Sequence, residues 1–386
     1  MLPQSADVVV IGGGVIGASI AYHLAKRKIR AVLLEKGDPA GGSSGACGGT
    51  VFLQTKSPGP NLKLALASAD RFRHLEAELA ADIEYDNRGG LIVIEREEER
   101  ETLAHLVDRQ QKAGLDVRLL DRQQARDLEP ALSPAILGAA FSPVDSQVSP
   151  WHLTFAFIKA ARGHGARVHT GTRVIGIRLS SHRVQSVATD NGEIATETVV
   201  NAAGVHAPRI AALVDLNVPI EPRRGQLVVT ESTGPLISRC MLSAQYIAAK
   251  FYPDLARKGG GVSIEPTAHG NFVLGSTREF AGFDKRVTPA GIQHIAANVA
   301  AILPALKRMK FIRVFAGLRP YTPDGLPILG RVAGPDGFVM AAGHEGDGIA
   351  LAPITGELIA DLIVDDRTRF SLEDYKLDRF SPIAPS

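Results

Sequence analysis

The stretch DVVVIGGGVIGASIAYHLA, residues 7 to 25, constrains the fold more than any other part of this chain. A short β-branched run, typical of a buried strand, leads into the glycine motif GGGVIG at residues 12 to 17. Isoleucine and leucine then recur every four residues between 16 and 24, which predicts one buried face of a helix. The apolar run AVLLE at residues 31 to 35 completes a unit the size of a βαβ crossover.

Three glycines of this unit stand at the spacing G-x-G-x-x-G, each with a physical role. Gly12 allows the tight turn, Gly14 lets the backbone approach a pyrophosphate, and Gly17 lets the helix pack closely on the strands. Glu35 ends the second strand, where a carboxylate accepts hydrogen bonds from ribose hydroxyls. Such an acid repels a ribose phosphate, so the unit predicts dinucleotide binding of the NAD or FAD kind and disfavours NADP.

Length, charge and cysteine content exclude several other classes of protein. The chain has 386 residues, which favours one large or two interleaved domains, and its formal net charge of +2 is too small to indicate nucleic acid or an anionic membrane. Two cysteines, Cys47 and Cys240, exclude a disulfide framework and a four-cysteine iron–sulfur cluster within the chain. Asp7 precedes the first apolar run where a signal peptide has basic residues, so we expect a strand there and a cytoplasmic protein.

The pattern changes along the chain from βαβ to mixed strands and back to helix. Helices are predicted at 62–80, 96–113, 151–162 and 288–304, and strands at 91–95, 117–120, 197–201, 226–230, 261–267 and 271–277. Asn191-Gly192 between two alternating runs predicts a hairpin. We find no internal repeat, so two interleaved domains are favoured over two separate ones.

Two further motifs leave alternatives open when taken alone. The loop GGSSGACGGT at residues 41 to 50 suits cofactor phosphates or a flavin edge, and is equally compatible with a surface loop. The segment ETVVNAAG at residues 197 to 204 ends in small residues, which is also the pattern of a buried strand with a tight exit. Neither motif by itself separates NAD from FAD.

In their order along the chain, these motifs resemble one family. GGGVIG, Glu35-Lys36, SSGACGGT, VVNAAG, RRGQ at 223 to 226, LRPYTPDGLPILG at 318 to 330 and GHEGDGIALAPITG at 343 to 356 follow one another. Together they resemble the FAD-dependent amino-acid oxidases and dehydrogenases, which include glycine oxidase, sarcosine oxidase and D-amino acid dehydrogenase. The likeness runs from about residue 6 to 365. The GHEGDG form most resembles the β subunits of opine and D-hydroxyproline dehydrogenases and a related subunit of bacterial cyanide synthase.

The resemblance implies an α/β fold, α+β overall, in which a Rossmann-type FAD-binding domain is interleaved with a substrate domain on a mixed or antiparallel sheet. The predicted FAD-binding domain comprises residues 1–84, 146–218 and 318–386, and the substrate domain comprises 85–145 and 219–317. Non-covalent FAD is expected, since the 41–50 loop has no histidine and Cys47 reads as a packing residue. The predicted cofactor-binding residues are Gly12, Gly14, Val15, Ile16, Gly17, Glu35, Lys36, Ser43, Ser44, Gly48, Gly49, Thr50, Val174, Ala202, Ala203, Gly204, Gly343, Gly346, Asp347, Gly348 and Ile349.

The segment around His344, Glu345 and Asp347 has three interpretations: a metal site, an anion-binding helix start or an ordinary loop. Adjacent residues such as 344 and 345 face differently, which disfavours convergence on one ion, so no metal is predicted. If residues 343 to 349 begin the final helix, its free N–H groups and positive dipole end face the cofactor. This interpretation places Pro353 in the first turn, where proline is tolerated.

Arg319 of the LRP segment is the predicted substrate ligand, because by resemblance to glycine oxidase this arginine pairs with the substrate carboxylate. A surface salt bridge is the alternative for Arg319. His344, Glu345 and Tyr252 are the other predicted catalytic residues, and each has packing or turn formation as its alternative. Tyr246 and Tyr321 are candidates for lining the pocket, and Arg224 is as compatible with a structural role as with a functional one.

The resemblance implies an enzyme that oxidises the C–N bond of an amino acid, with a secondary amine such as an opine or hydroxyproline favoured, to an imine that water hydrolyses. It also implies a β subunit whose partner subunits carry further redox centres. A stand-alone oxidase that uses oxygen, a non-catalytic FAD-binding subunit and an enzyme for 2-hydroxy acids stay open as alternatives.

Overall fold

The computed structural model describes residues 1–251 and 261–380. In this part of the chain the helices are α1 (Val15–Lys26), α2 (Pro60–Leu79), α3 (Glu97–Lys112), α4 (Arg122–Leu128), α5 (Pro150–Gly163), α6 (Ala207–Ala211), α7 (Ala244–Phe251), α9 (Pro289–Ile302) and α10 (Gly348–Val364). The strands are β1 (Val8–Ile11), β2 (Ala31–Leu34), β3 (Thr50–Val51), β4 (Gly90–Ile94), β5 (Arg118–Asp121), β6 (Gly138–Ser142), β7 (Ser146–Gln147), β8 (Arg167–His169), β9 (Val174–Ser180), β10 (Arg183–Thr189), β11 (Gly192–Ala195), β12 (Val199–Asn201), β13 (Glu221–Thr230), β14 (Cys240–Ser243), β15 (Ser263–Pro266), β16 (Phe272–Gly275), β17 (Phe311–Tyr321), β18 (Ile328–Arg331) and β19 (Phe338–Ala342).

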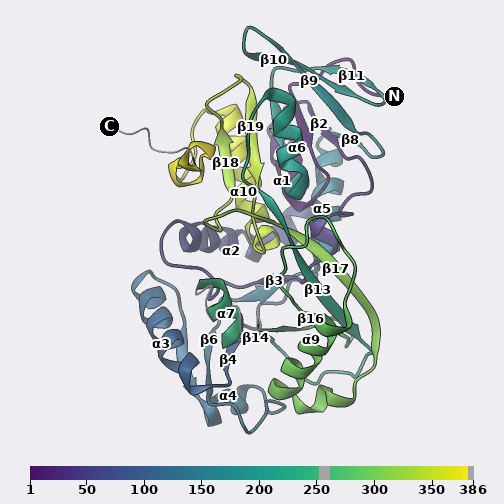
Figure 1. The fold of residues 1–386 in the computed structure, drawn as a ribbon. Helices are drawn as coiled ribbons and strands as arrows, with labels where there is room; N and C mark the ends of the chain where they lie inside the picture. The colour runs from purple at the N-terminus through teal and green to yellow at the C-terminus, as the bar shows by residue number, and fades with distance from the viewer. Residues whose placement is uncertain (252–260, 381–386) are drawn as a thin grey trace.

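One sheet, as far as the structure describes it, has six strands in the order β18-β19-β12-β1-β2-β8. Its pairs are parallel except for β18 and β19, which are antiparallel. The side chains of alternate β1 residues pack into two different hydrophobic cores, one on each face of the sheet. Val8 and Val10 pack with α1, α5 and α10, whereas Val9 and Ile11 pack with the three-stranded sheet β9–β11. Burial on both faces explains why β1 is a continuous apolar run (Figure 1).

The described part of a second sheet has eight strands in the order β17-β13-β16-β15-β14-β4-β6-β5. It is mixed, because β14 pairs with β4 in parallel while its other pairs are antiparallel. Ile295, Val299 and Ile302 of α9 cover one face together with strand residues such as Met241 and Ile264. The long pair β13 and β17 extends from this sheet toward the six-stranded sheet (Figure 1). Both sheets therefore meet near the upper ends of β13 and β17.

The predicted fold class is confirmed: an α/β arrangement with a parallel nucleotide-type sheet and a mixed sheet. The βαβ unit, the hairpin at Asn191-Gly192 and the helices α2, α3, α5 and α9 form where the sequence patterns predict them. Strand β13 begins at Glu221, earlier than the predicted 226, because its first residues pair with β17. The domain boundaries at 84, 145, 218 and 317 stay a prediction.

The start of the last helix differs from the prediction. Helix α10 begins at Gly348, and residues 343–347 form a turn in which Gly343 and Glu345 have φ values of 81° and 49°. A positive φ is incompatible with a right-handed helix, which explains the later start. Pro353 therefore lies in the second turn and not in the first, so the prediction for it is wrong. The carbonyl of Ile349 loses its helical partner there, and the burial of α10 against α1 compensates for the loss.

Within residues 1–251 and 261–380, no helix is both long enough and apolar enough to cross a membrane.

Candidate active site

The turn between β1 and α1 is closed by glycines that no larger residue can replace. Gly12 has a φ of 116°, and a Cβ there would lie 2.5 Å from the carbonyl oxygen of Ala202. A Cβ on Gly17 would lie 2.0 Å from the carbonyl oxygen of Gly12. No side chain caps α1 at Gly14, and Val15 N–H binds the hydroxyl of Ser44 at 3.0 Å. The remaining N–H groups of the first turn therefore suit an anion.

Glu35 follows β2 and is held by backbone groups on both sides. Its Oε2 accepts from Gly13 N–H at 2.7 Å and its Oε1 from Gly37 N–H at 2.9 Å. The carboxylate is thereby fixed beside the glycine turn with lone pairs left for hydroxyl donors. This is the arrangement that binding of a ribose requires.

A cavity of about 680 Å³ extends from this turn to the β13–β17 pair. The predicted cofactor-binding residues that line it are Gly12, Gly14, Val15, Ile16, Glu35, Lys36, Ser43, Ser44, Gly48, Thr50, Val174, Ala202, Ala203, Gly204, Gly346, Asp347, Gly348 and Ile349. Gly17, Gly49 and Gly343 are not among the lining residues. Gly17 instead packs α1 on the turn, Gly49 lies against the carbonyl of Val148, and Gly343 packs on Thr322.

The loop of residues 41 to 50 joins the two sheets. The hydroxyl of Ser43 donates to the carbonyl of Leu318 on β17. Gly49 N–H donates to Oε2 of Glu265 on β15 at 2.8 Å. A Cβ on Gly48 would lie 2.1 Å from Oε1 of Glu265, so only glycine fits beside this carboxyl. The loop is therefore a wall of the cavity and not a free surface loop.

Arg319 lies at the far end of the cavity, on β17 opposite Arg223 of β13. Its Nη1 donates to the carbonyl of Thr277 at 3.1 Å, and its Nη2 donates to the hydroxyl of Ser276. A Cβ on Gly225 would lie 2.5 Å from Nη1, so this glycine makes room for the guanidinium. Burial lowers the pKa of Arg319 from its ordinary value; Tyr246 and Glu345 oppose this effect, and the charges of Arg278 and Arg223 add to it. Both of its partners are neutral, which suits the binding of an anion.

Tyr246 and Arg278 form the side of the cavity beside Arg319. The Cζ of Arg278 lies 4.3 Å from the centroid of the Tyr246 ring. Burial raises the pKa of the Tyr246 hydroxyl, but the charges of Arg278 and Arg319 outweigh it and bring the pKa below its ordinary value. Tyr321 is not a lining residue and packs at 4.7 Å against the guanidinium of Arg223, and Tyr252 lies outside the described residues.

Residues 344, 345 and 347 turn toward three different partners. His344 Nε2 lies 3.1 Å from the hydroxyl of Thr355, Glu345 pairs with Arg223, and Asp347 pairs with Lys56 at 2.6 Å. Divergence of this kind prevents the three side chains from sharing one metal ion. Burial lowers the pKa of His344 to about 4, so its imidazole is neutral near pH 7.

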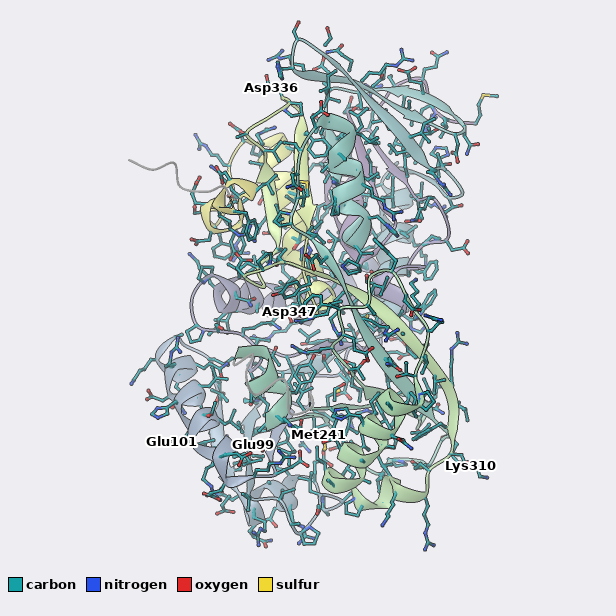
Figure 2. The ribbon with its side chains drawn as sticks, viewed as in Figure 1. Glu99, Glu101, Met241, Lys310, Asp336 and Asp347 are labelled. Carbon is teal, nitrogen blue, oxygen red and sulfur yellow. The ribbon has the colours of Figure 1, made fainter. Side chains whose placement is uncertain are left out.

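The Lys56–Asp347 pair is buried, with the two side chains 2% and 11% exposed. Asp347 precedes α10 and does not cap it with its side chain. Figure 2 shows Asp347 where the upper and lower parts of the molecule meet. The first N–H groups of α10 and a fixed ion pair therefore border the cavity together, since Lys56, Gly348 and Ile349 also line it.

Two buried groups, Cys47 of the 41–50 loop and Glu265 beside it on β15, have pKa values above their ordinary ones. Burial raises the pKa of Glu265 to about 7, against the lowering effect of its bonds from Gly49 N–H and the Ser263 hydroxyl. Burial likewise raises the pKa of the Cys47 thiol to about 12, so it is not a thiolate near pH 7. A neutral thiol that donates to the Ser44 carbonyl at 3.5 Å behaves as a packing residue.

The polar lining residues that sequence reasoning missed include Lys56, Glu265 and Arg278. Glu265 carried a usable signal, because Ser263 and Glu265 alternate with apolar Val262 and Ile264 along one strand. Arg278 directly follows the residues that close β16, as functional residues at strand ends do. Lys56 stands in an irregular segment, where no period marks it. Arg224, whose role stayed open, is absent from the cavity lining and binds Glu279 and Asp284.

Comparisons with known proteins agree with this geometry. The model of the DAO family, described as FAD dependent oxidoreductase, matches residues 7–362. The chain belongs to this family. It is 33% identical over 380 residues to the glycine oxidase of Geobacillus kaustophilus, with 97% of each chain covered. It is 31% identical over 422 residues to hydrogen cyanide synthase subunit HcnC of Pseudomonas aeruginosa, covering 98% of this chain and 97% of that one.

Two solved structures share the fold over nearly the whole chain. The glycine oxidase of Geobacillus kaustophilus superposes with a TM-score of 0.90 at 32% identity, covering 98% of this chain and 100% of that one. L-proline dehydrogenase from P. horikoshii also has a TM-score of 0.90, at 28% identity, with 98% of each chain covered. The predictions of FAD as the cofactor and of an FAD-dependent amino-acid oxidoreductase are confirmed.

The residues of this chain fit FAD. The crowded glycine turn approaches a pyrophosphate closely, the anchored Glu35 suits a ribose, and the cavity continues past the 41–50 loop to Arg319. The same cavity thus extends from the turn that suits the cofactor to the buried guanidinium of Arg319.

Proposed function

We propose that this chain oxidises the C–N bond of a secondary amino acid of the opine or hydroxyproline type, as the β subunit of a hetero-oligomeric dehydrogenase. The observation that carries the proposal is the guanidinium of Arg319, which lies in the cofactor cavity with two neutral hydrogen-bond partners. A guanidinium has five N–H donors and matches a carboxylate with two parallel bonds. Arg319 therefore binds the substrate carboxylate and orients the α-carbon.

The charges around Arg319 also select the reactive form of the amine. Burial lowers the pKa of Arg319 most strongly, and the same water-poor surroundings and the charge of Arg278 disfavour a protonated amine. Only the neutral amine has a nitrogen lone pair. This lone pair stabilises the positive charge that develops on the α-carbon as the hydride leaves. Arg319 thus attracts the carboxylate while its neighbours keep the nitrogen uncharged.

Bound FAD would supply the acceptor for the substrate's α-hydrogen, which leaves as a hydride with two electrons. The remaining iminium group takes up water and separates into a 2-oxo acid and a protonated amine, which balances atoms and charge. The N–H groups at the start of α10 stabilise negative charge in the adjoining cavity by about 0.3–1 kcal/mol. His344 is neutral and buried, so we assign it to shaping the turn. Positioning and preorganised charge supply most of the rate.

The role as a β subunit rests on likeness and on cysteine count. One relative is by its name a subunit of hydrogen cyanide synthase. The chain's two cysteines do not suffice for a four-cysteine cluster, so any such cluster belongs to a partner. The likeness to glycine oxidase favours a second candidate, a stand-alone oxidase that transfers the electrons to oxygen. Reoxidation of the reduced protein by air, measured against a dye acceptor, separates the two: rapid reaction with air supports the oxidase.

The carboxylate assignment is tested with Arg319→Ala and Arg319→Lys. We compare sarcosine with its amide, sarcosinamide, in anaerobic rapid-mixing experiments that follow the flavin absorbance. Loss of the bidentate bonds lowers the rate constant for sarcosine by about 10²- to 10³-fold in Arg319→Ala, and much less for the amide. Lysine keeps the charge without the fork, so Arg319→Lys restores part of the loss.

The matched control is Arg313→Ala, which removes an exposed arginine from the same strand. It leaves both substrates unaffected. An Arg319→Ala variant that retains its FAD and still reacts normally with sarcosine contradicts the assignment. The rate constants for opine, hydroxyproline and glycine substrates in the same assay then show which substrate class reacts fastest.

A further inference from the structure

The charged side chains near Arg319 are of two kinds: those in ion pairs, and arginines without an acidic hydrogen-bond partner among the described residues. Arg223 binds Glu345, and Lys56 binds Asp347 at 2.6 Å. Each pair contributes one positive and one negative charge, so the four groups add little net charge to the cavity. The carboxyl of Glu265 is held by Gly49 N–H and the Ser263 hydroxyl.

The second kind consists of two arginines with no acidic hydrogen-bond partner among the described residues. Arg319 donates to a carbonyl and a hydroxyl. Arg278 lies over the ring of Tyr246, 4.3 Å from its centroid. One substrate carboxylate balances the charge of Arg319. The charge of Arg278 then remains for a second anion.

The donors of Arg278 point to the same conclusion. Its Nε and Nη1 atoms are buried, and neither has a hydrogen-bond partner within the part of the chain that the structure describes. Burial lowers the pKa of Arg278, but Tyr246, Glu345 and Asp347 outweigh it and keep the guanidinium charged. The guanidinium also has a side-chain hydrogen bond with Tyr246, so Nε and Nη1 are the donors that lack partners. Buried donors of a charged group without hydrogen-bond partners are costly, so they mark a place where a ligand completes them.

The neighbouring Arg224 shows what a structural arginine looks like in this fold. Its Nε and Nη2 both donate to Glu279, and its Nη1 donates to the carbonyl of Arg286 at 3.0 Å. Arg224 does not line the cavity, whereas Arg278 does. Arg224 therefore has a structural role, because its donors bind protein groups. Two donors of Arg278 have no such partner and are available to a ligand.

We propose that Arg278 is a specificity-determining residue that binds a second carboxylate of the substrate, so that the preferred substrate is a dicarboxylic secondary amino acid. One carboxylate binds Arg319, the second, on the nitrogen substituent or the side chain, binds Arg278, and the nitrogen lies between them. This inference rests on the proposed function and narrows it. It favours an opine-type substrate over hydroxyproline, which has a single carboxylate.

The test uses iminodiacetate, the simplest secondary amine with two carboxylates, and its monoamide, which has the same shape with one charge fewer. FAD-loaded wild type, Arg278→Gln, Arg278→Lys and the surface control Arg313→Gln are each titrated by calorimetry and mixed anaerobically with both compounds. Wild type and Arg313→Gln favour the diacid by about 10- to 100-fold in affinity, the range of one hydrogen-bonded charge pair. Arg278→Gln binds the two compounds equally, and Arg278→Lys keeps part of the preference.

The two readouts separate the inference from the proposed function. A preference in binding that disappears in Arg278→Gln supports the subsite, even if neither compound bleaches the flavin band, a result that would argue against amine oxidation. Bleaching by both compounds without any preference in wild type supports amine oxidation and overturns the subsite. Equal preference in wild type and Arg278→Gln, or no binding of the diacid to wild type, also overturns it. Unchanged FAD content and unchanged affinity for the monoamide show that Arg278→Gln is folded.

Discussion

Replacement of Gly225 by alanine is expected to damage substrate binding while leaving the protein folded. The new Cβ would lie 2.5 to 2.7 Å from the Nη1, Nη2 and Cζ atoms of Arg319. Ordinary contact needs 3.4–4 Å, so the guanidinium has to move by about 1 Å. The clashing atoms belong to the end of a flexible side chain, and the backbone of β13 does not have to shift. The strain therefore falls on the substrate site and not on the fold.

The size of the effect follows from what Arg319 loses. A shift of about 1 Å in a positioning group costs about 10²-fold in rate. The bonds to Ser276 and Thr277 weaken as well, and hydrogen bonds to charged groups contribute about 1.5–3 kcal/mol each. We expect the second-order rate constant for a carboxylate substrate to fall by about 10²- to 10³-fold. The free energy of unfolding changes by less than about 1 kcal/mol.

Anaerobic rapid mixing with sarcosine measures this rate constant, and the flavin content and a urea unfolding curve measure the fold. Gly163→Ala is the matched control, because a Cβ on this helical glycine of α5 meets nothing within 4 Å. It leaves the rate unchanged. A Gly225→Ala protein with the wild-type rate constant, or one that loses FAD and stability together, refutes the reasoning.

Two further substitutions test other parts of the account. Gly17→Ala places a Cβ 2.0 Å from the backbone oxygen of Gly12, which cannot move aside, so we expect loss of FAD binding with a lowered melting temperature, measured by flavin fluorescence and thermal unfolding; full FAD content in this variant contradicts the assigned turn. Burial holds the native pKa of Glu265 at about 7, above the 4.5 of an ordinary glutamate. The native state therefore keeps a proton that the unfolded state releases, and stability falls as pH rises from about 4.5 to 7, by up to about 3 kcal/mol for this group. Glu265→Gln removes this contribution, so urea unfolding at pH 5 and pH 8 differs less in the variant than in wild type; the same pH dependence in both proteins disproves the assignment. Burial also raises the pKa of Asp145 to about 7, so a pH dependence of the same sign remains in both proteins.

Local patterns predicted the strand, glycine turn and helix at the nucleotide-binding end of the cavity. The close contact of Gly17 with the carbonyl of Gly12 is set within one βαβ unit, so the spacing of these glycines in the sequence predicts it. Glu35 comes next to Gly13 because β1 and β2 are adjacent parallel strands, which the same unit dictates. These contacts depend on short stretches of chain, and family likeness extended them to the 41–50 loop.

The substrate half depends on contacts between distant strands, which periodicity does not reveal. Arg278 reaches Arg319 and Tyr246 only because β16 pairs with β13 and β13 pairs with β17. Lys56 meets Asp347 across 291 positions of the sequence. The start of α10 was misplaced for a different reason: the positive φ of Glu345 is rare for a non-glycine residue, so no propensity rule predicts it. The roles of the individual site residues stay predictions until they are tested by substitution.

The central claim is that this chain binds FAD and takes a hydride from the α-carbon of an amino acid. The most direct test is an anaerobic visible absorption spectrum of the purified, FAD-loaded chain before and after addition of an amino acid or the 2-hydroxy acid of the same carbon skeleton. We predict that a secondary amino acid from a panel of opines, prolines and sarcosine bleaches the flavin band and yields one equivalent of carbonyl product, while its hydroxy acid does not. A flavin band that no amino acid bleaches, or that only the hydroxy acid bleaches, contradicts the account.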